Sequence, residues 1–173
     1  MRIAYTKAEE RGDMDRLLAG VAEDLAARGL RCCGIVQINS PDCDNRTCDM
    51  DVQVLPDGPR IRISQSLGPE ARGCRLDVGA LETAVGECER RLDAQVDVLI
   101  VNKFGKREAE GGGFRALIAE ALSLDVPVVV GVNGLNETAF LDFTAGAAVA
   151  LPPRAGAVRD WVIAAAAPLD ATA

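Results

Sequence analysis

The sequence predicts an α/β fold: a three-layer α/β/α sandwich with a mostly parallel sheet and a small β-hairpin insertion. Runs such as VDVLIV at residues 96–101 and PVVVGV at 127–132 are apolar throughout, which is typical of strands buried on both faces. Segments with apolar residues at helical spacing separate these runs, as in repeated strand–helix units. Because the chain has 173 residues, 49% of them apolar, we expect one domain over residues 1–173.

The first half of the chain carries strand, helix and hairpin signals in that order. Asp13 precedes a helical repeat of apolar residues and is expected to be its N-cap, while Gly29 fits the end of that helix. Alternating residues flank Pro56-Asp57-Gly58, which predicts a hairpin within an insertion at about residues 48–67. In order, the expected elements are a strand at 3–6, a helix from 13, a strand at 31–37, a polar loop at 39–49 and hairpin strands at 50–54 and 60–64.

The second half continues the alternation of strands and helices. The expected elements are a helix at 78–94, a strand at 96–101, a helix at 114–124, a strand at 127–132, a strand at 147–151 and a helix at 158–167. Parallel sheets of this kind bind ligands beyond the carboxyl ends of their strands. We therefore expect the functional site in the loops that follow Thr6, Gln37, Val101 and Val132.

Composition excludes several functions. The 19 basic and 26 acidic residues give a net charge of -7, which opposes binding to nucleic acid. The chain has no His, which removes imidazole bases, Ser-His-Asp catalysis and zinc sites that need a nitrogen ligand. The start MRIAYTKAEERGD lacks a signal-peptide core, and no window reaches the roughly 20 apolar residues of a membrane span, so we expect no membrane insertion.

The cysteines indicate a reducing compartment. A domain of this size needs no disulfides, and without a CxxC motif a zinc or iron–sulfur site has little support, so any metal stays unknown. We therefore expect a cytoplasmic protein with reduced thiols. The cysteines are Cys32, Cys33, Cys43, Cys48, Cys74 and Cys88.

Lysines are few and lie near predicted strand ends. Lys7 follows the first strand, and Lys103 and Lys106 follow the strand at 96–101. An ammonium group is a compact charge that suits oxyanions and phosphates. Each lysine alone is compatible with an ordinary solvated side chain, but their common edge favours a local anion site despite the acidic net charge.

The segment from Asn102 to Gly113 is the most informative part of the chain. Its glycines come just before a predicted helix, where backbone N–H groups can surround an anion. Glu108 and Glu110 are either solvated carboxylates or a general base and magnesium ligands, and Glu108 is the candidate catalytic residue. The candidate ligand-binding residues of this segment are Asn102, Lys103, Gly105, Lys106, Glu108, Gly111, Gly112 and Gly113.

The first loop departs from the phosphate-binding pattern G-x-x-x-x-G-K-[ST]. When the pattern is laid on residues 7–14 with Gly12 as its second glycine, Lys7 stands at the first glycine. Asp13 then replaces the lysine, and Met14 replaces the hydroxyl that binds magnesium. Because Asp13 would repel a triphosphate, we expect no ordinary ATP or GTP hydrolysis by this loop.

Residues 64–77 form a second distinctive stretch. Ser64 can offer a hydroxyl and Arg75 a forked donor to an oxyanion. Cys74 is either a soft metal ligand or a small buried apolar residue. Asp77 is expected to be the N-cap of the helix that follows, rather than a ligand.

Two resemblances follow from these motifs. The order of elements resembles the thermophilic-type nucleoside-triphosphatase branch of the P-loop fold, with Asn102 and Lys103 in place of an acidic pair at a strand end. RGLRCCGIVQ, SQSLGPEARGCRLD, VDVLIVNKFGKREAEGGGFR and VPVVVGV together resemble an uncharacterised bacterial domain-of-unknown-function family, often encoded beside molybdate ABC-transporter genes. This likeness extends to about Leu151. It implies a P-loop-NTPase-like fold with a degenerate Walker A loop and a link to molybdenum homeostasis.

Three functions remain open. The first is capture of an oxyanion such as molybdate, or of a phosphate-bearing ligand, without a covalent step. The alternative is an NTPase or phosphotransferase that uses Mg and a nucleotide, with Lys103 or Lys106 on the phosphates. A non-catalytic regulatory scaffold is a further alternative. The expected partners are a small anionic ligand and molybdenum transport or cofactor proteins, and a homo-oligomer is compatible with the sequence.

Overall fold

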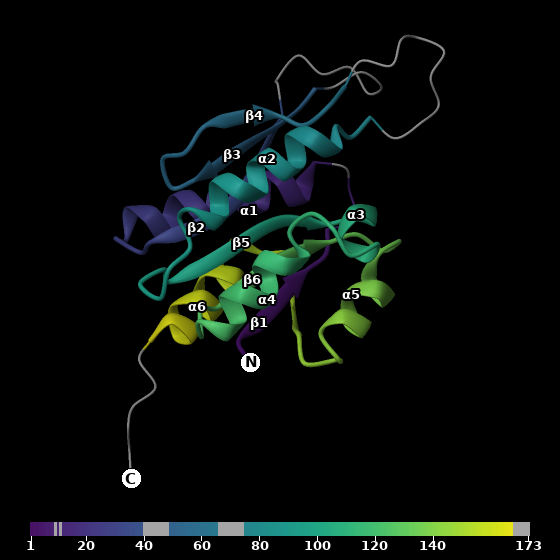
Figure 1. The fold of residues 1–173 in the computed structure, drawn as a ribbon. Helices are drawn as coiled ribbons and strands as arrows, with labels where there is room; N and C mark the ends of the chain where they lie inside the picture. The colour runs from purple at the N-terminus through teal and green to yellow at the C-terminus, as the bar shows by residue number, and fades with distance from the viewer. Residues whose placement is uncertain (9, 11, 40–48, 66–74, 168–173) are drawn as a thin grey trace.

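The computed structural model describes residues 1–8, 10, 12–39, 49–65 and 75–167. Figure 1 shows strands and helices alternating along most of the chain. The strands are β1 (Ile3–Thr6), β2 (Cys32–Asn39), β3 (Met50–Leu55), β4 (Arg60–Arg62), β5 (Val98–Phe104), β6 (Val128–Val132) and β7 (Val149–Leu151). The helices are α1 (Asp13–Ala27), α2 (Val78–Glu89), α3 (Lys106–Ala109), α4 (Arg115–Ser123), α5 (Glu137–Phe143) and α6 (Ala155–Ala166).

The strands form a seven-stranded sheet in the order β4-β3-β2-β5-β6-β1-β7. The neighbours among β2, β5, β6, β1 and β7 pair in parallel, whereas the hairpin of β3 and β4 adds antiparallel strands to the free edge of β2. The carboxyl ends of the parallel strands therefore meet at one edge of the sheet.

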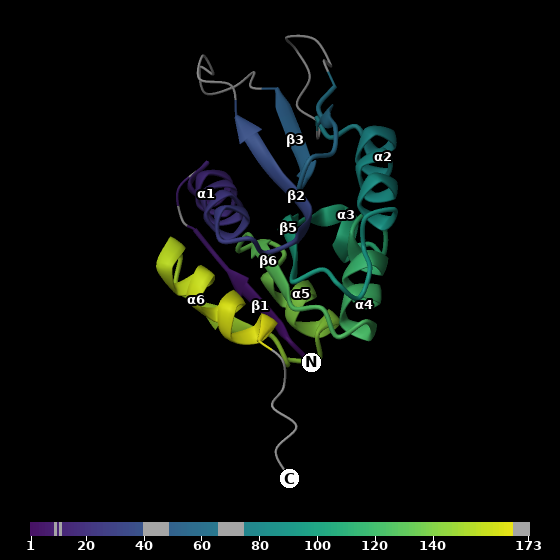
Figure 2. The same cartoon turned by 90° about the vertical axis from the view of Figure 1, so that its left-hand side faces the viewer.

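Helices cover the sheet on both faces (Figure 2). On one face α1 and α6 pack over a core that includes Leu18, Leu25 and Val158. On the other face α2, α4 and α5 cover a larger core that includes Phe114 and Phe140. The expected three-layer α/β/α sandwich with a mostly parallel sheet is confirmed, and the hairpin continues the sheet instead of standing apart from it.

Helix ends agree with the sequence at some positions and differ at others. The Asp77 carboxylate accepts a hydrogen bond from the Ala80 backbone N at 3.0 Å, so the expected N-cap of α2 is confirmed. Gly29 has a φ of 84° directly after the end of α1, as a helix-terminating glycine should. Asp13 is wrong as an N-cap: Gly12 occupies that position, and Asp13 is the first residue of α1 and pairs with Arg16. Helix α2 ends at Glu89, short of the expected residue 94.

Strand β5 is longer than expected. It runs to Phe104, so Asn102 and Lys103 belong to the strand and not to the loop that follows. Two short helices that the sequence pattern does not predict, α3 and α5, follow β5 and β6.

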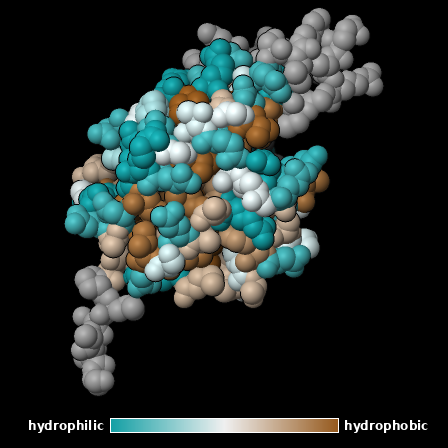
Figure 3. All heavy atoms as spheres, viewed as in Figure 1, coloured by the Kyte–Doolittle hydropathy of each residue, from teal (hydrophilic) through white to brown (hydrophobic). Residues whose placement is uncertain are grey.

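In the described part of the chain, no helix is long and apolar enough to cross a membrane. In the view of Figure 3, the region around β3, β4 and α2 is largely hydrophilic.

Candidate functional site

The carboxyl ends of β1, β6 and β5 place three residues on the face of the sheet that α1 covers. Thr6 pairs with Gly131, and Asn102 follows Val101, which pairs with Val130. Tyr5 packs against the core under α2 and α4, so alternation along β1 turns Thr6 toward α1. A side chain at Gly131 would come within 3.0 Å of Met14 in the first turn of α1, so the absence of a Cβ lets helix and sheet approach closely.

Asp15, in the first turn of α1, is the centre of this group. Its side chain is only 5% exposed, and its Oδ1 accepts a hydrogen bond from Asn102 Nδ2 at 3.2 Å. Lys103 Nζ lies 3.4 Å from the same oxygen. A buried carboxylate needs charge compensation and hydrogen bonds, and the end of β5 supplies both.

Two buried oxygen atoms on this face of the sheet have no hydrogen-bond partner among the described residues. They are Asn102 Oδ1 and Thr6 Oγ1, and both residues are almost completely buried. Such atoms in a native fold require a reason, such as a bound water or ligand. Asn102 therefore has an unused hydrogen-bond acceptor next to the carboxylate of Asp15.

Lys7, directly after β1, is held by a carboxylate on α5. Its Nζ lies 2.7 Å from Glu137 Oε2, and the Tyr5 hydroxyl donates to Glu137 Oε1 at 3.3 Å. The hydrogen bond from Lys7 lowers the pKa of Glu137 below its ordinary value. Burial raises the pKa of Tyr5, and the nearby Glu137 charge adds to that effect. The Lys7 ammonium group is thus fixed over the end of β1 while its side chain remains 44% exposed.

An aromatic cluster fixes α5 and thereby Glu137. The ring centroids of Tyr5 and Phe140 lie 5.4 Å apart, and those of Phe104 and Phe140 lie 5.3 Å apart. Phe143 stacks on Phe104 at 5.9 Å, and the Arg115 guanidinium lies 4.4 Å from the centre of the Phe143 ring. These contacts join the ends of β1 and β5 to α4 and α5.

Glu108 is buried and engaged by its own loop. Its Oε2 accepts from the Gly105 backbone N at 2.9 Å, and its Oε1 accepts from the Phe114 backbone N at 3.2 Å. The carboxylate therefore closes the segment between α3 and α4 as a capping group. Gly113, with a φ of 56°, leaves room for it, since a Cβ there would lie 2.1 Å from Glu108 Oε1. This geometry favours a positioning role for Glu108 over general-base chemistry.

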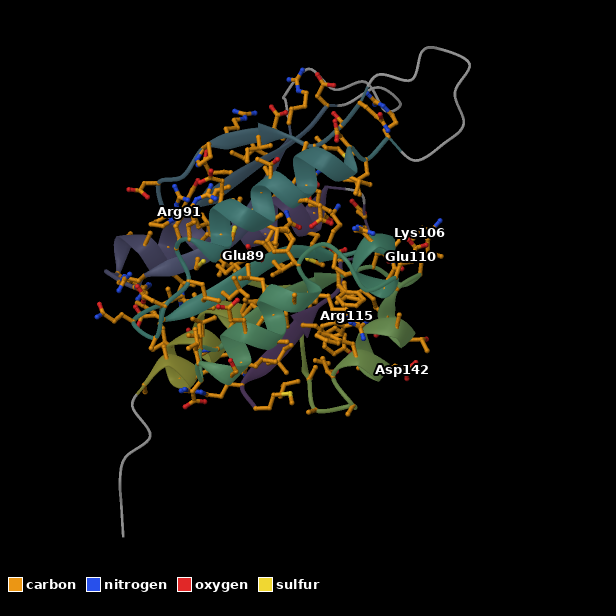
Figure 4. The ribbon with its side chains drawn as sticks, viewed as in Figure 1. Glu89, Arg91, Lys106, Glu110, Arg115 and Asp142 are labelled. Carbon is orange, nitrogen blue, oxygen red and sulfur yellow. The ribbon has the colours of Figure 1, made fainter. Side chains whose placement is uncertain are left out.

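The other candidate residues in the segment from Asn102 to Gly113 are Lys106 and the three glycines, and each has different surroundings. Lys106 is 82% exposed, pairs with Glu110 at 3.6 Å and points outward from α3 (Figure 4). The expectation that all three lysines gather is therefore corrected: Lys106, the first residue of α3, is turned into solvent, while Lys7 contacts Glu137 on α5 and Lys103 contacts Asp15 on α1. Of the three glycines, Gly113 donates its backbone N–H to Glu82, and the Arg107 guanidinium occupies the space beside Gly112. A side chain at Gly111 would meet open space.

Ser64 and Arg75 form a separate group at the other end of the sheet. The Ser64 hydroxyl accepts from the Met50 backbone N at 2.9 Å and lies 3.4 Å from Asp49 Oδ1. Arg75 lies 3.7 Å from the same carboxylate, and its Nε donates to the Gln65 carbonyl at 3.4 Å. Ser64 follows β4, which is separated from β5 by β3 and β2, so the structure does not bring these residues to the lysines. Cys74, the other candidate of this stretch, lies outside the described residues.

The first loop borders an open hollow of about 570 Å³. Two of its side chains are carboxylates, and Asp13 pairs with Arg16 at its edge. Such a lining does not favour a phosphate. The hollow is lined by Ala8, Glu10, Asp13, Arg16, Leu17 and Pro153.

Cysteines within the described residues have no metal site. Cys32, Cys33 and Cys88 are buried free thiols, and no group of three or more His, Cys, Asp or Glu in the described ranges could hold a metal ion. Burial raises the pKa of Cys32 to about 11, so this thiol stays protonated at neutral pH. Cys43 and Cys48 lie outside the described residues.

Asp15, Thr6 and Glu137 were not among the residues that the sequence pattern predicted for the site. Asp15 carried a usable signal, because a charged residue stands at the spacing of the buried positions Leu18 and Ala22 on α1. Thr6 and Glu137 carried none, since their positions depend on the order of the strands and on the unpredicted helix α5.

The arrangement of strands and helices is an α/β fold that two solved structures share. A human cancer-related nucleoside triphosphatase solved in solution is similar over 95% of this chain and 97% of its own, with a TM-score of 0.67 and 19% identity. THEP1 from the hyperthermophile Aquifex aeolicus is similar over 89% of this chain and 90% of its own, with a TM-score of 0.61 and 18% identity. At these identities the likeness shows the fold.

The chain itself belongs to the family described as "Protein of unknown function (DUF2478)", whose model matches residues 3–161. A curated relative, "Molybdenum import ATP-binding protein ModC 2" of Bradyrhizobium diazoefficiens (strain JCM 10833 / BCRC 13528 / IAM 13628 / NBRC 14792 / USDA 110), is 34% identical over 160 residues. That match takes in 92% of this chain but only 18% of the relative, so the chain spans less than a fifth of its length.

Proposed function

We propose that this domain binds a small oxyanion or a phosphate-bearing ligand at the carboxyl ends of β1 and β5, without hydrolysing a nucleotide. The observation that carries the proposal is the placement of two ammonium groups, Lys7 and Lys103, at the ends of strands on either side of β6. Open α/β sheets bind their ligands at this edge. The Thr6 hydroxyl, which has no partner among the described residues, is a further donor for an oxyanion.

Molybdate is the first ligand to test. The name of the curated relative connects a chain that contains a similar segment to molybdenum import. A domain that senses or carries molybdate would have molybdenum transport or cofactor proteins as partners. We place this activity in the cytoplasm, in agreement with the three buried free thiols among the described residues.

Nucleotide hydrolysis is the second candidate, and the likeness to two nucleoside triphosphatase folds favours it. Three features of the site oppose it. Asp13 stands where the phosphate-binding lysine is expected, Glu108 is engaged by backbone N–H groups, and the adjoining hollow carries carboxylates. We therefore prefer binding without hydrolysis.

Calorimetric titration with molybdate, sulfate, phosphate and Mg-ATP in parallel tests the proposal. We expect saturable binding of an oxyanion, weakened about tenfold or more by Lys7→Ala or Lys103→Ala, since each removes a charge-assisted hydrogen bond. Lys106→Ala is the matched control and should leave the affinity unchanged, because Lys106 is 82% exposed and pairs with Glu110 instead of Asp15. Binding of Mg-ATP alone, or oxyanion affinity unaffected by both substitutions, would reject the proposal.

A further inference from the structure

The P-loop fold ordinarily implies a magnesium ion beside the phosphates. The metal is held there by a Ser or Thr at the start of the first helix and an acidic residue at a strand end. Mg²⁺ requires near-octahedral oxygen coordination and is usually bound through one or two carboxylates together with substrate phosphates. Whether this chain can hold Mg²⁺ depends on the oxygens that α1 and β5 present.

The donor set between α1 and β5 does not fit a divalent cation. Its carboxylate, Asp15, is already matched by an ammonium group, since Lys103 Nζ lies 3.4 Å from Asp15 Oδ1. The same oxygen accepts from the Asn102 amide at 3.2 Å. Among the described residues, the buried side-chain oxygens on this face of the sheet without a hydrogen-bond partner, Asn102 Oδ1 and Thr6 Oγ1, are uncharged. An ion of charge +2 would thus enter a group whose net charge is already zero, beside a fixed positive charge.

We infer that the Lys103 ammonium group takes the place of the divalent cation in this domain. Asp15 holds Lys103 over the end of β5, and the ligand approaches a positive charge that belongs to the protein. The ligand class that follows is a free tetrahedral oxyanion without bound metal, in contrast to a magnesium–nucleotide complex. This assignment of the ligand rests on the proposed function, whereas the exclusion of Mg²⁺ stands on the contacts of Asp15 alone.

Magnesium titration of the protein without any anion tests this inference. Followed by calorimetry and by the melting temperature in MgCl2 against EDTA, the unmodified protein should show no site-specific binding. Lys103→Glu places a second carboxylate beside Asp15, so it should bind Mg²⁺ about tenfold or more tightly than the unmodified protein and melt higher in MgCl2. Lys106→Glu makes the same charge change outside the site and is the matched control, with no gain expected.

Several outcomes would overturn the inference. Magnesium binding by the unmodified protein that Asp15→Asn removes would show that Lys103 does not replace the cation. A folded Lys103→Glu variant that gains no affinity for Mg²⁺ would also show that Lys103 does not replace the cation. If that variant does not fold, Lys103→Gln, which removes the ammonium group without adding a charge, should still gain affinity for Mg²⁺, and no gain would contradict the inference.

Different results would reject the proposed oxyanion binding and the inference about Lys103. An unmodified protein that binds neither oxyanion nor Mg²⁺ rejects oxyanion binding and leaves the role of Lys103 intact. An unmodified protein that binds molybdate or phosphate only when Mg²⁺ is present keeps the function and overturns the inference.

Discussion

Asp15 shows how a single residue can locate a site. A carboxylate on the buried face of α1 would be costly without compensation, and its partners Asn102 and Lys103 come from a strand almost ninety residues away. The spacing of Asp15 with the buried residues of α1 can be recognised in the sequence, but its partners cannot. Only the packing of α1 against β5 makes the three residues one group.

The backbone contacts of Glu108 lead to a stability prediction. Glu108→Ala should lower the free energy of unfolding by about 2 kcal/mol, because the Gly105 and Phe114 N–H groups lose their acceptor. Chemical denaturation measures this change, and oxyanion affinity of the folded variant should remain. The matched control Glu110→Ala, with its side chain 55% exposed, should change stability little. Equal effects of the two substitutions would contradict a capping role for Glu108.

The ion pair between Lys7 and Glu137 predicts a dependence of stability on pH. Lys7 lowers the pKa of Glu137 in the folded protein, so this contact stabilises the fold above the ordinary carboxyl pKa of about 4.3. The contribution is lost as the pH falls through the lowered folded-state pKa. Urea denaturation should therefore find Glu137→Gln less stable than the unmodified protein at pH 7, with the difference shrinking by about pH 3. A difference that stays constant over this range would contradict the assignment.

At the scale of elements, the pattern of apolar residues predicted the central strands well, but it predicted the segments at the carboxyl ends of the strands poorly. The runs of β5 and β6 are buried on both faces, and hydrophobicity alone identifies them. The continuation of β5 through Asn102 and Lys103 cannot be predicted from hydrophobicity, because polar residues end an apolar run even where the strand continues. Helices α3 and α5 are too short for a helical repeat to be evident, and tertiary packing around Phe104 and Phe140 stabilises the region.

The close approach of β2 and β5 requires a glycine at position 34. It has a φ of 109°, and a Cβ there would lie 2.0 Å from the Ile100 carbonyl oxygen of the neighbouring strand β5. Gly34→Ala should therefore destabilise the fold by about 3 kcal/mol or more, measured by thermal or chemical unfolding.

Gly20→Ala is the matched control for this substitution. Gly20 lies in the middle of α1 with nothing within 4 Å of an added Cβ, so alanine should raise stability by about 1 kcal/mol. A neutral Gly34→Ala variant would show that β2 and β5 do not approach as closely as described.

At the scale of the whole molecule, the strand order decides which candidates can act together. The order places β6 between β1 and β5, so Lys7 and Lys103 follow strands that are one strand apart, while Ser64 and Arg75 lie beyond β2 and β3. A linear sequence indicates that all these residues follow strands, but it does not contain the order of the strands. The sequence therefore predicts which residues lie near the ends of strands, but not which of them lie close together.

The most direct test of the whole account is oxyanion binding measured with and without magnesium. In calorimetry, the unmodified protein should bind molybdate or another tetrahedral oxyanion equally in MgCl2 and in EDTA, and Lys103→Ala should weaken that binding about tenfold or more. Saturable binding of Mg-ATP with no oxyanion binding would contradict the account, and would identify the domain as a nucleotide-binding member of its fold.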